Sequence, residues 1–156
     1  MIKVNIVCVG KVKESYFKEG IQEYSKRLSR FCDFSIIELE EENLKNPSKA
    51  QIEEIINKEG KKILGALKGK VIALAIEGKK KSSEELADLI KNLSNEGGVM
   101  TFVIGGSYGL SREVKEKAEY KLSFSDMTFP HTLARLMLTE QIYRAFSIIE
   151  GSAYHK

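Results

Sequence analysis

The sequence predicts an α/β fold in which a mainly parallel β-sheet carries helices on both faces. Short apolar segments with the character of strands alternate with amphipathic helical segments along the chain, and this order is typical of a parallel sheet. The segments Val71–Ile76 and Val99–Ile104 are continuously apolar, as expected of strands that are covered on both faces. No repeat, low-complexity tract or linker interrupts the alternation, so we expect one domain over residues 1–156.

The elements of the first half are predicted from local patterns. The strands are rich in β-branched residues, and the helices carry apolar side chains at helical spacing. Ser48, with Gln51 three residues further on, has the pattern of a capping box that begins a helix. In chain order we expect a strand at Ile2–Val9, a helix at Glu14–Arg30, a strand at Phe34–Leu39 and a helix from Ser48 to about Leu67.

Glycine and serine residues divide the second half. Gly78 is expected to end a strand, Ser82 or Ser83 and Ser111 are expected to cap helices, and the pair Gly97-Gly98 is expected to end one. The predicted elements are strands at Val71–Ile76, Val99–Ile104 and Tyr120–Phe124, and helices at Glu84–Leu93, Arg112–Lys117 and Thr132 to about Ile149.

The last predicted helix is apolar around most of its circumference. Arg135 and Thr139 form one narrow polar stripe, and Glu140, Arg144 and Ser147 form another. A helix that covers one face of its own sheet needs a single apolar stripe. Two apolar sectors therefore predict that one packs inside the chain and the other against a second copy, in a homodimer. A helix that is fully buried within a monomer is the alternative.

The composition is that of an ordinary soluble globular protein, with 42% apolar and 30% charged residues. The longest apolar runs are far shorter than the ~20 residues that a membrane-spanning helix needs, so no membrane partner is expected. The chain opens directly into a strand, without the charged segment and apolar core of a signal peptide. We therefore expect a cytoplasmic protein.

The net charge of +3 is mildly basic and below what is typical of a dedicated nucleic-acid binder. Lysine clusters such as Lys79–Lys81 are interpreted first as solvated turns and helix ends. Contact with RNA phosphates is the alternative, and it gains weight if dimerisation joins two such clusters.

Metal chemistry has little support in the sequence, and we expect no metal ion. The two cysteines, Cys8 and Cys32, match no metal-binding spacing and no disulfide framework, and Cys8 is expected to be an inert buried thiol. The two histidines, His131 and His155, do not form an HxxxH-type pair.

Two neighbouring loops at strand ends predict a small-molecule pocket. The strand ending at Ile104 continues into Gly105-Gly106-Ser107-Tyr108-Gly109, and glycines let a ligand approach the backbone closely. The next strand ends in a polar loop before Pro130. The chain has no GxGxxG, GxxxxGK[ST] or GxSxG motif, no Ser–His–Asp order, and no evident pair of catalytic carboxylates. These absences favour chemistry carried by a cofactor.

Five segments in order resemble one family, and the chain also ends as that family does. They are Ile6–Lys11, Leu74–Lys79, Ile104–Leu110, Leu122–His131 and Glu140–Phe146, followed by the closing Tyr154-His155-Lys156. The family is that of the RlmH-type rRNA methyltransferases, minimal members of the SPOUT (trefoil-knot) class. The resemblance implies methylation of N3 of a pseudouridine in 23S rRNA of assembled ribosomes, with S-adenosylmethionine as the methyl donor. It also implies a homodimer and a C-terminal trefoil knot, through which the final helix is threaded.

The resemblance also implies roles for individual residues. Leu74 would line the adenine side of the cofactor, and Gly105 would offer its backbone. The loop that encloses the cofactor would consist of Phe124, Ser125, Asp126, Met127, Thr128 and Phe129. Ala75 stands where families of this type often have aspartate, which removes a carboxylate there and leaves a backbone role for Leu74 unaffected.

The C-terminal residues are the candidates for catalysis. N3 of the target base carries a proton, and His155 is the best candidate for a general base or proton relay. Tyr154 is suited to stack on the uracil ring or to donate a hydrogen bond to its carbonyl. His131 and Arg135 are candidate RNA contacts, with structural roles as the alternatives. A frayed terminus is the alternative for the tail.

Two other classes of function stay open on the residues alone. The first is a non-catalytic RNA- or nucleotide-binding module, which would bind RNA without cofactor turnover. The second is a flavodoxin-like or NADP-using enzyme, which the lack of GxGxxG and of an acidic residue placed for the ribose disfavours. Flavin absorbance or co-purified S-adenosylmethionine would distinguish them.

Overall fold

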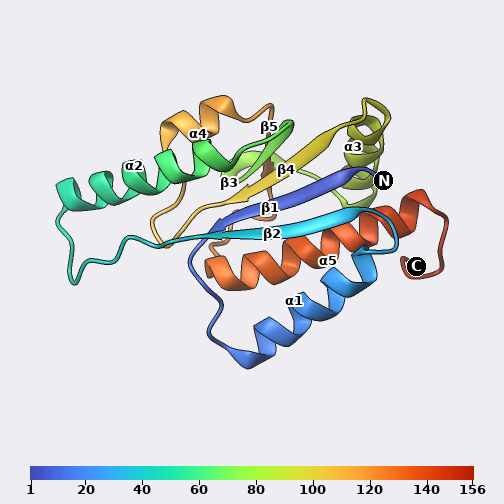
Figure 1. The fold of residues 1–156 in the computed structure, drawn as a ribbon, viewed down its shortest axis with the longest axis horizontal. Coiled ribbons are helices and arrows are strands. Elements are labelled where there is room, and N and C mark those ends of the chain that lie inside the picture. Colours follow the sequence, from blue (N-terminus) through green and yellow to red (C-terminus); the bar gives the residue numbers. More distant parts are fainter.

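A five-stranded, all-parallel sheet runs through the middle of the protein, and helices cover both of its faces (Figure 1). The computed structural model describes residues 1–156. The strands are β1 (Lys3–Val9), β2 (Asp33–Leu39), β3 (Lys70–Lys80), β4 (Val99–Ile104) and β5 (Tyr120–Ser123), in the spatial order β2-β1-β4-β3-β5. The helices are α1 (Ser15–Leu28), α2 (Lys49–Ala66), α3 (Ser83–Asn95), α4 (Arg112–Lys117) and α5 (His131–Ile149).

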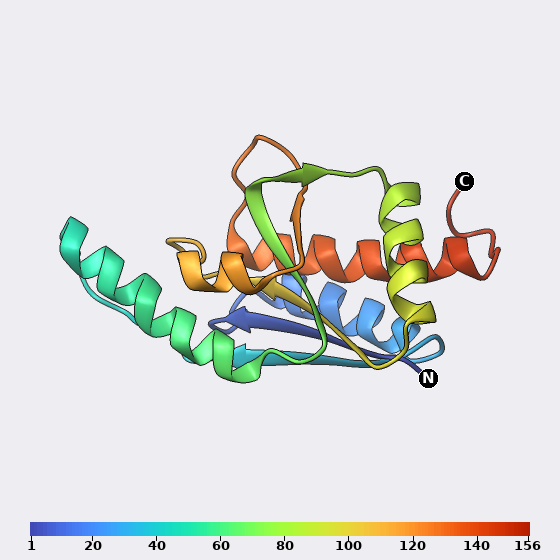
Figure 2. The same ribbon diagram turned by 90° about the horizontal axis from the view of Figure 1, so that it is seen from above.

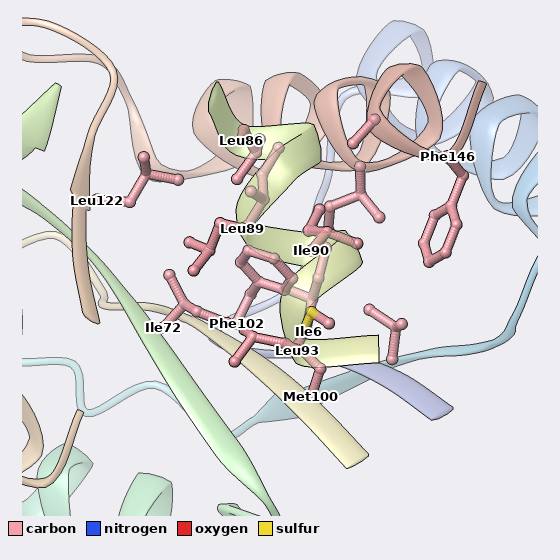
Figure 3. Packing of buried hydrophobic residues seen from close by; sticks show 14 of the residues in the cluster. Ile6, Ile72, Leu86, Leu89, Ile90, Leu93, Met100, Phe102, Leu122 and Phe146 are labelled. Atoms are coloured by element: carbon pink, nitrogen blue, oxygen red, sulfur yellow. The ribbon is translucent and has the colours of Figure 1, made fainter. Parts of the chain in front are cut away.

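The two faces of the sheet carry two separate apolar cores. Helices α1, α3 and α5 cover one face, and α2 and α4 cover the other (Figure 2). Successive residues of β1 point to opposite faces, so Ile6 belongs to the larger core and Val7 to the smaller one. Phe102 of β4 and Ile90 of α3 are among the residues of the larger core (Figure 3). The predicted α/β class, parallel sheet and two-sided cover are confirmed.

The predicted caps are also found, and they explain where the helices begin. Ser48 and Gln51 form the expected capping box before α2, and Ser82 forms a second one with Glu85 before α3. Ser111 accepts a hydrogen bond from the backbone N–H of Val114 and caps α4. None of the five helices has the length and apolar character of a membrane span.

Strand β3 differs from the prediction, because it does not end at Gly78. It continues to Lys80, and its pairing with β5 moves from Leu74–Leu122 to Lys79–Leu122. The residues between these two pairs bulge out of the ladder. A Cβ atom on Gly78 would lie 2.7 Å from the carbonyl carbon of Lys121, so this glycine permits a close approach of the two strands. The prediction that the strand ends at Gly78 was wrong. The glycine stands there because the two strands pack closely, and it does not end β3.

Helix α5 shows a second difference, at the predicted polar stripe of Arg135 and Thr139. Both residues are buried, and the Arg135 side chain faces the sheet. Its guanidinium donates to Oε2 of Glu38 at 2.5 Å and to the carbonyl oxygen of Gly10 at 3.0 Å. The prediction that Arg135 contacts RNA is therefore wrong, since only 1% of the residue is exposed and its two terminal nitrogens donate to Glu38 and to the backbone at the end of β1.

We expect the substitution Arg135→Met to lower the free energy of unfolding by about 3 kcal/mol. It keeps most of the side-chain volume but removes the donors to Gly10, and it leaves the Glu38 carboxylate without its partner. Urea unfolding at a fixed protein concentration measures the effect. Arg112→Met is the control, because Arg112 is an exposed residue of α4 and its substitution should leave stability nearly unchanged. Equal unfolding midpoints for both variants would contradict the prediction.

Candidate active site

A cavity of about 780 Å³ opens where β4 and β5 end, beside the bulged middle part of β3. Its volume lies within the range of about 300–1,000 Å³ that is usual for small-molecule sites. The wall is formed by residues 74–77 of β3, by residues 104–110 at the end of β4, by the loop after β5, and by Lys115 and the first turn of α5. The two loops that the sequence singled out therefore meet at one cavity.

The glycine-rich loop is folded tightly against itself. The N–H of Gly109 donates to the carbonyl oxygen of Gly106 at 3.1 Å, and Gly109 has a φ of +88°. A Cβ atom on Gly105 would lie 2.7 Å from the carbonyl carbon of Gly109, so no other residue fits at Gly105 without moving the loop. The turn holds Ser107 and the half-exposed Tyr108 at the wall of the cavity.

The loop after β5 is held by its own serines. Ser123 Oγ donates to the carbonyl oxygen of Ser125 at 3.1 Å, and Ser125 Oγ accepts from the N–H of Met127 at 3.1 Å. Asp126 forms an ion pair of 2.5 Å with Lys80, and it is not part of the cavity wall. The other predicted cofactor residues do line the cavity, namely Leu74, Gly105, Phe124, Ser125, Met127, Thr128 and Phe129.

Sequence analysis missed an ion pair in the wall of the cavity. Glu77 Oε1 and Lys115 Nζ lie 2.6 Å apart. The hydrogen bond from Lys115 is the main cause that lowers the pKa of Glu77, which keeps this carboxylate ionised. Glu77 belongs to the Leu74–Lys79 segment that resembles the family, so the sequence could have indicated it. No feature of the sequence indicates Lys115.

His131 is the first residue of α5 and lines the cavity. Its Nδ1 atom is shielded from solvent and has no hydrogen-bond partner within the chain. Its ring lies close to Gly10, where a Cβ atom would be 3.7 Å from Cε1 of His131. The structure thus places His131 beside the cavity, and its contact with RNA stays a prediction.

Tyr154 belongs to a polar cluster at the other end of α5. Its hydroxyl lies 3.3 Å from Oε1 of Glu140 and 3.4 Å from the hydroxyl of Tyr24, and its ring packs edge-on against Tyr143. Burial, then the hydrogen bond with Tyr24 and the charge of Glu140, raise the pKa of Tyr154 far above its ordinary value. Tyr154 therefore stays a neutral phenol that donates hydrogen bonds.

His155 is held in the same cluster by two charged side chains. Its Nε2 lies 2.7 Å from Oε1 of Glu84 in α3, and its Nδ1 lies 3.1 Å from Nη1 of Arg144 in α5. Arg144 is itself paired with Glu140 at 2.6 Å, and its guanidinium lies over the ring of Tyr154. The tail is thus docked on the protein rather than frayed.

The cavity and the tail cluster are far apart within one chain. The tail packs on Glu140 and Arg144, which follow His131 by 9 and 13 residues, or about 14 to 20 Å along α5 at a rise of ~1.5 Å per residue. His131 lies at the cavity end of α5, while Tyr154 and His155 follow its other end (Figure 2). Neither tail residue lines the cavity. The two predicted catalytic residues therefore do not reach the cavity of their own chain.

The remaining nucleophilic and metal-binding side chains form no further site. Burial raises the pKa of the Cys8 and Cys32 thiols to about 12, so both stay protonated, as predicted for Cys8. No group of three or more His, Cys, Asp or Glu side chains is arranged to hold a metal ion. A second cavity of about 590 Å³ lies between α1, α3 and α5 and shares Phe124 with the first.

Comparison with known proteins finds relatives over the whole chain. Residues 2–155 match the sequence model of a family described as predicted SPOUT methyltransferases. A protein of Streptococcus uberis named ribosomal RNA large subunit methyltransferase H is 52% identical over 159 residues, covering 99% of this chain and 100% of the relative. Proteins of the same name from Carboxydothermus hydrogenoformans and Clostridioides difficile are 53% and 54% identical, with the same coverage.

Two solved structures share the fold at low sequence identity. A probable methylase family protein from Haemophilus influenzae Rd KW20 has a TM-score of 0.57 and 15% identity, over 98% of this chain and 70% of the other. A probable methyltransferase from Bordetella pertussis Tohama I has a TM-score of 0.55 and 11% identity, over 92% and 96%. At such identities the likeness shows the fold alone.

We expect Gly105→Val to weaken binding of S-adenosylmethionine at least about tenfold in isothermal titration calorimetry. The new side chain would collide with the backbone at Gly109, so the loop must move out of its present position. Gly65→Ala is the control, because a Cβ atom at this helical position meets nothing within 4 Å and should leave binding unchanged. Unchanged affinity in a folded Gly105→Val variant would contradict the expectation.

Proposed function

This chain belongs to the SPOUT methyltransferase family, and we propose that it methylates N3 of a pseudouridine in large-subunit (23S) ribosomal RNA, with S-adenosylmethionine as the methyl donor. The observation that carries the proposal is the identity of 52–54%, over nearly the whole chain, to relatives named ribosomal RNA large subunit methyltransferase H. Residues 1–156 would act as one domain on assembled ribosomes in the cytoplasm. The trefoil knot is expected from family membership.

The residues of the large cavity fit the cofactor. Leu74, Phe124 and Phe129 offer apolar surface for the adenine ring, and the glycine-rich loop offers backbone groups. The ionised Glu77 is suited to accept hydrogen bonds from ribose hydroxyls. The bound cofactor supplies a methyl group activated by its sulfonium, so the chain mainly has to align the cofactor and the base.

The tail cluster supplies groups that suit the target base. The neutral hydroxyl of Tyr154 is suited to donate to a uracil carbonyl, and the His155 imidazole is suited to take the N3 proton. Removal of this proton makes the N3 electron pair available for attack on the methyl carbon. We keep the sequence-based roles of both residues as proposals.

We propose that the active site is shared between two chains of a homodimer. The tail packs on the second half of α5, at Glu140 and Arg144, while the cavity lies at the first turn, so the rigid helix keeps the two apart within one chain. A twofold axis that pairs two α5 helices antiparallel would bring each tail to the cavity of the other chain. Leu133, Leu136 and Met137 remain partly exposed on α5 and would provide apolar contact for such a pair.

Basic residues beside the cavity are candidate RNA contacts. Lys79, Lys80 and Lys121 are exposed on β3 and β5, next to the loop that lines the cavity. Lysines at such a rim would neutralise phosphates around the target nucleotide, and binding to the ribosome should then weaken as salt rises.

The direct test is methyl transfer from labelled S-adenosylmethionine to ribosomes that lack the modification, with the product mapped by mass spectrometry. We expect label on N3 of one 23S pseudouridine, and a strong loss of transfer in His155→Ala with cofactor binding intact. Cofactor binding without any label would contradict the proposed target. RNA binding without cofactor binding would favour the non-catalytic module instead.

Mixing two defective variants tests the shared site. Gly105→Val weakens cofactor binding and His155→Ala removes the proposed base, so each homodimer should have little activity when S-adenosylmethionine is kept well below the Kd of the Gly105→Val variant. After the two variants are refolded together, a mixed dimer has one intact cavity, from the His155→Ala chain. This cavity faces the intact tail of the Gly105→Val chain. We expect recovery of about a quarter of the wild-type activity, since about half of the dimers are mixed and each has one competent site. No recovery, with mixed dimers demonstrated by mass spectrometry, would contradict sharing.

A further inference from the structure

We propose that Glu84 is a positioning residue that orients His155 and presents its Nδ1 atom as the acceptor for the substrate proton. The inference rests on the proposed function, because it assigns a partner to the base of that reaction. Glu84 lies in the first turn of α3, 71 residues before His155 in the sequence, and its Oε1 lies 2.7 Å from Nε2 of His155. Neither sequence motifs nor the cavity wall had pointed to Glu84.

The partners of the imidazole ring define its tautomer. A guanidinium has only N–H donors, so the contact of 3.1 Å from Arg144 requires Nδ1 of His155 to be the acceptor. A carboxylate has only acceptors when ionised, so Nε2 must carry the proton that is donated to Glu84. A ring protonated on both nitrogens would set an N–H of Nδ1 against an N–H of Arg144. The docked ring is therefore neutral, with its one lone pair on Nδ1.

The ionised state of Glu84 supports this arrangement. The hydrogen bond with His155 is the first cause that lowers the pKa of Glu84 below its ordinary value of 4.5. A carboxyl group whose pKa is lowered in the folded protein stabilises that state at pH values above its ordinary pKa. This contribution is lost as the pH falls through the lowered pKa. The contact is therefore fully present at neutral pH. The other ionisable groups around the ring are Arg144 and Glu140 of α5, Tyr24 of α1, and Tyr154.

The proton transfer follows from the tautomer. When the target base enters, its N3–H replaces the Arg144 N–H at Nδ1 of His155. The N3–H bond then breaks and an Nδ1–H bond forms, while the N3 electron pair bonds to the methyl carbon and the carbon–sulfur bond breaks toward sulfur. The imidazolium that results keeps its Nε2–H bond to the Glu84 carboxylate, which stabilises the new charge. The aspartate of a Ser-His-Asp triad orients its histidine in the same way, although it is buried and the Glu84 side chain is 63% exposed.

Glu84→Gln tests the charge while keeping an oxygen that accepts from Nε2. We expect the single-turnover rate of methyl transfer to ribosomes to fall at least about tenfold, with unchanged affinity for S-adenosylmethionine. The acidic limb of the pH–rate profile should move to lower pH, because the protonated ring has lost its counter-charge. If Glu84 only anchored the tail, its substitution would not shift the acidic limb of the pH–rate profile. Asp88→Asn, one turn further along the exposed side of α3, is the control and should match the wild type. A wild-type rate and profile in Glu84→Gln would overturn the proposal.

A second measurement does not depend on turnover, so it separates this proposal from the proposed function. The chain has only two histidines, and a His131→Gln variant assigns their resonances in ¹⁵N-histidine NMR spectra. We expect the Nε2–H tautomer of His155 at neutral pH in the wild-type protein, and a loss of this preference in Glu84→Ala. An Nδ1–H tautomer or an even mixture in the wild-type protein would overturn the proposal, even if methyl transfer is demonstrated.

Discussion

The buried guanidinium of Arg135 joins the last helix to the first two strands, and both halves of the candidate site depend on that connection. It binds Glu38 of β2 and the carbonyl oxygen of Gly10 at the end of β1, which lie 97 and 125 residues earlier in the chain. A buried charge is tolerated only when its partners are in place, so the contact holds α5 at one depth and in one register. The cavity lies at one end of this fixed helix, and the tail cluster lies at the other.

This arrangement separates the cavity proposed to bind the cofactor from the side chains proposed for acid–base chemistry. The cavity has apolar walls, backbone groups and one ion pair, between Glu77 and Lys115. The tail cluster holds the titratable groups, with His155 between Glu84 and Arg144. A helix of 19 residues is too stiff to fold one end onto the other. A second chain is therefore the simplest way to bring the two parts together, and it gives the partly exposed face of α5 a reason to be apolar.

Local patterns in the sequence predicted the elements and the two loops, because caps, apolar runs and glycines act over a few residues. Contacts between distant residues were not predictable in the same way. The sequence alone leaves Arg135 open between an RNA contact and a structural role, because Glu38 lies 97 residues away. Gly78 resembles a strand terminator in the sequence, because Lys121 packs against it only in the folded sheet. The sequence predicts Asp126 in the loop that encloses the cofactor, whereas in the structure its side chain pairs with Lys80. Family resemblance predicts a functional tail, but only the structure shows that the tail does not line the cavity of its own chain.

Under the proposed mechanism, the docked tail also explains how His155 would stay idle as a base until substrate is present. Both nitrogens of His155 are occupied, Nε2 by Glu84 and Nδ1 by Arg144, so the ring has no free lone pair in the isolated chain. Only the Arg144 contact can be exchanged for a substrate N–H, since both donate to the same atom. The exchange replaces one hydrogen bond by another and therefore costs little free energy. Arg144 keeps its bonds to Glu140 throughout, so the released guanidinium stays beside the substrate, where its positive charge favours the deprotonated base.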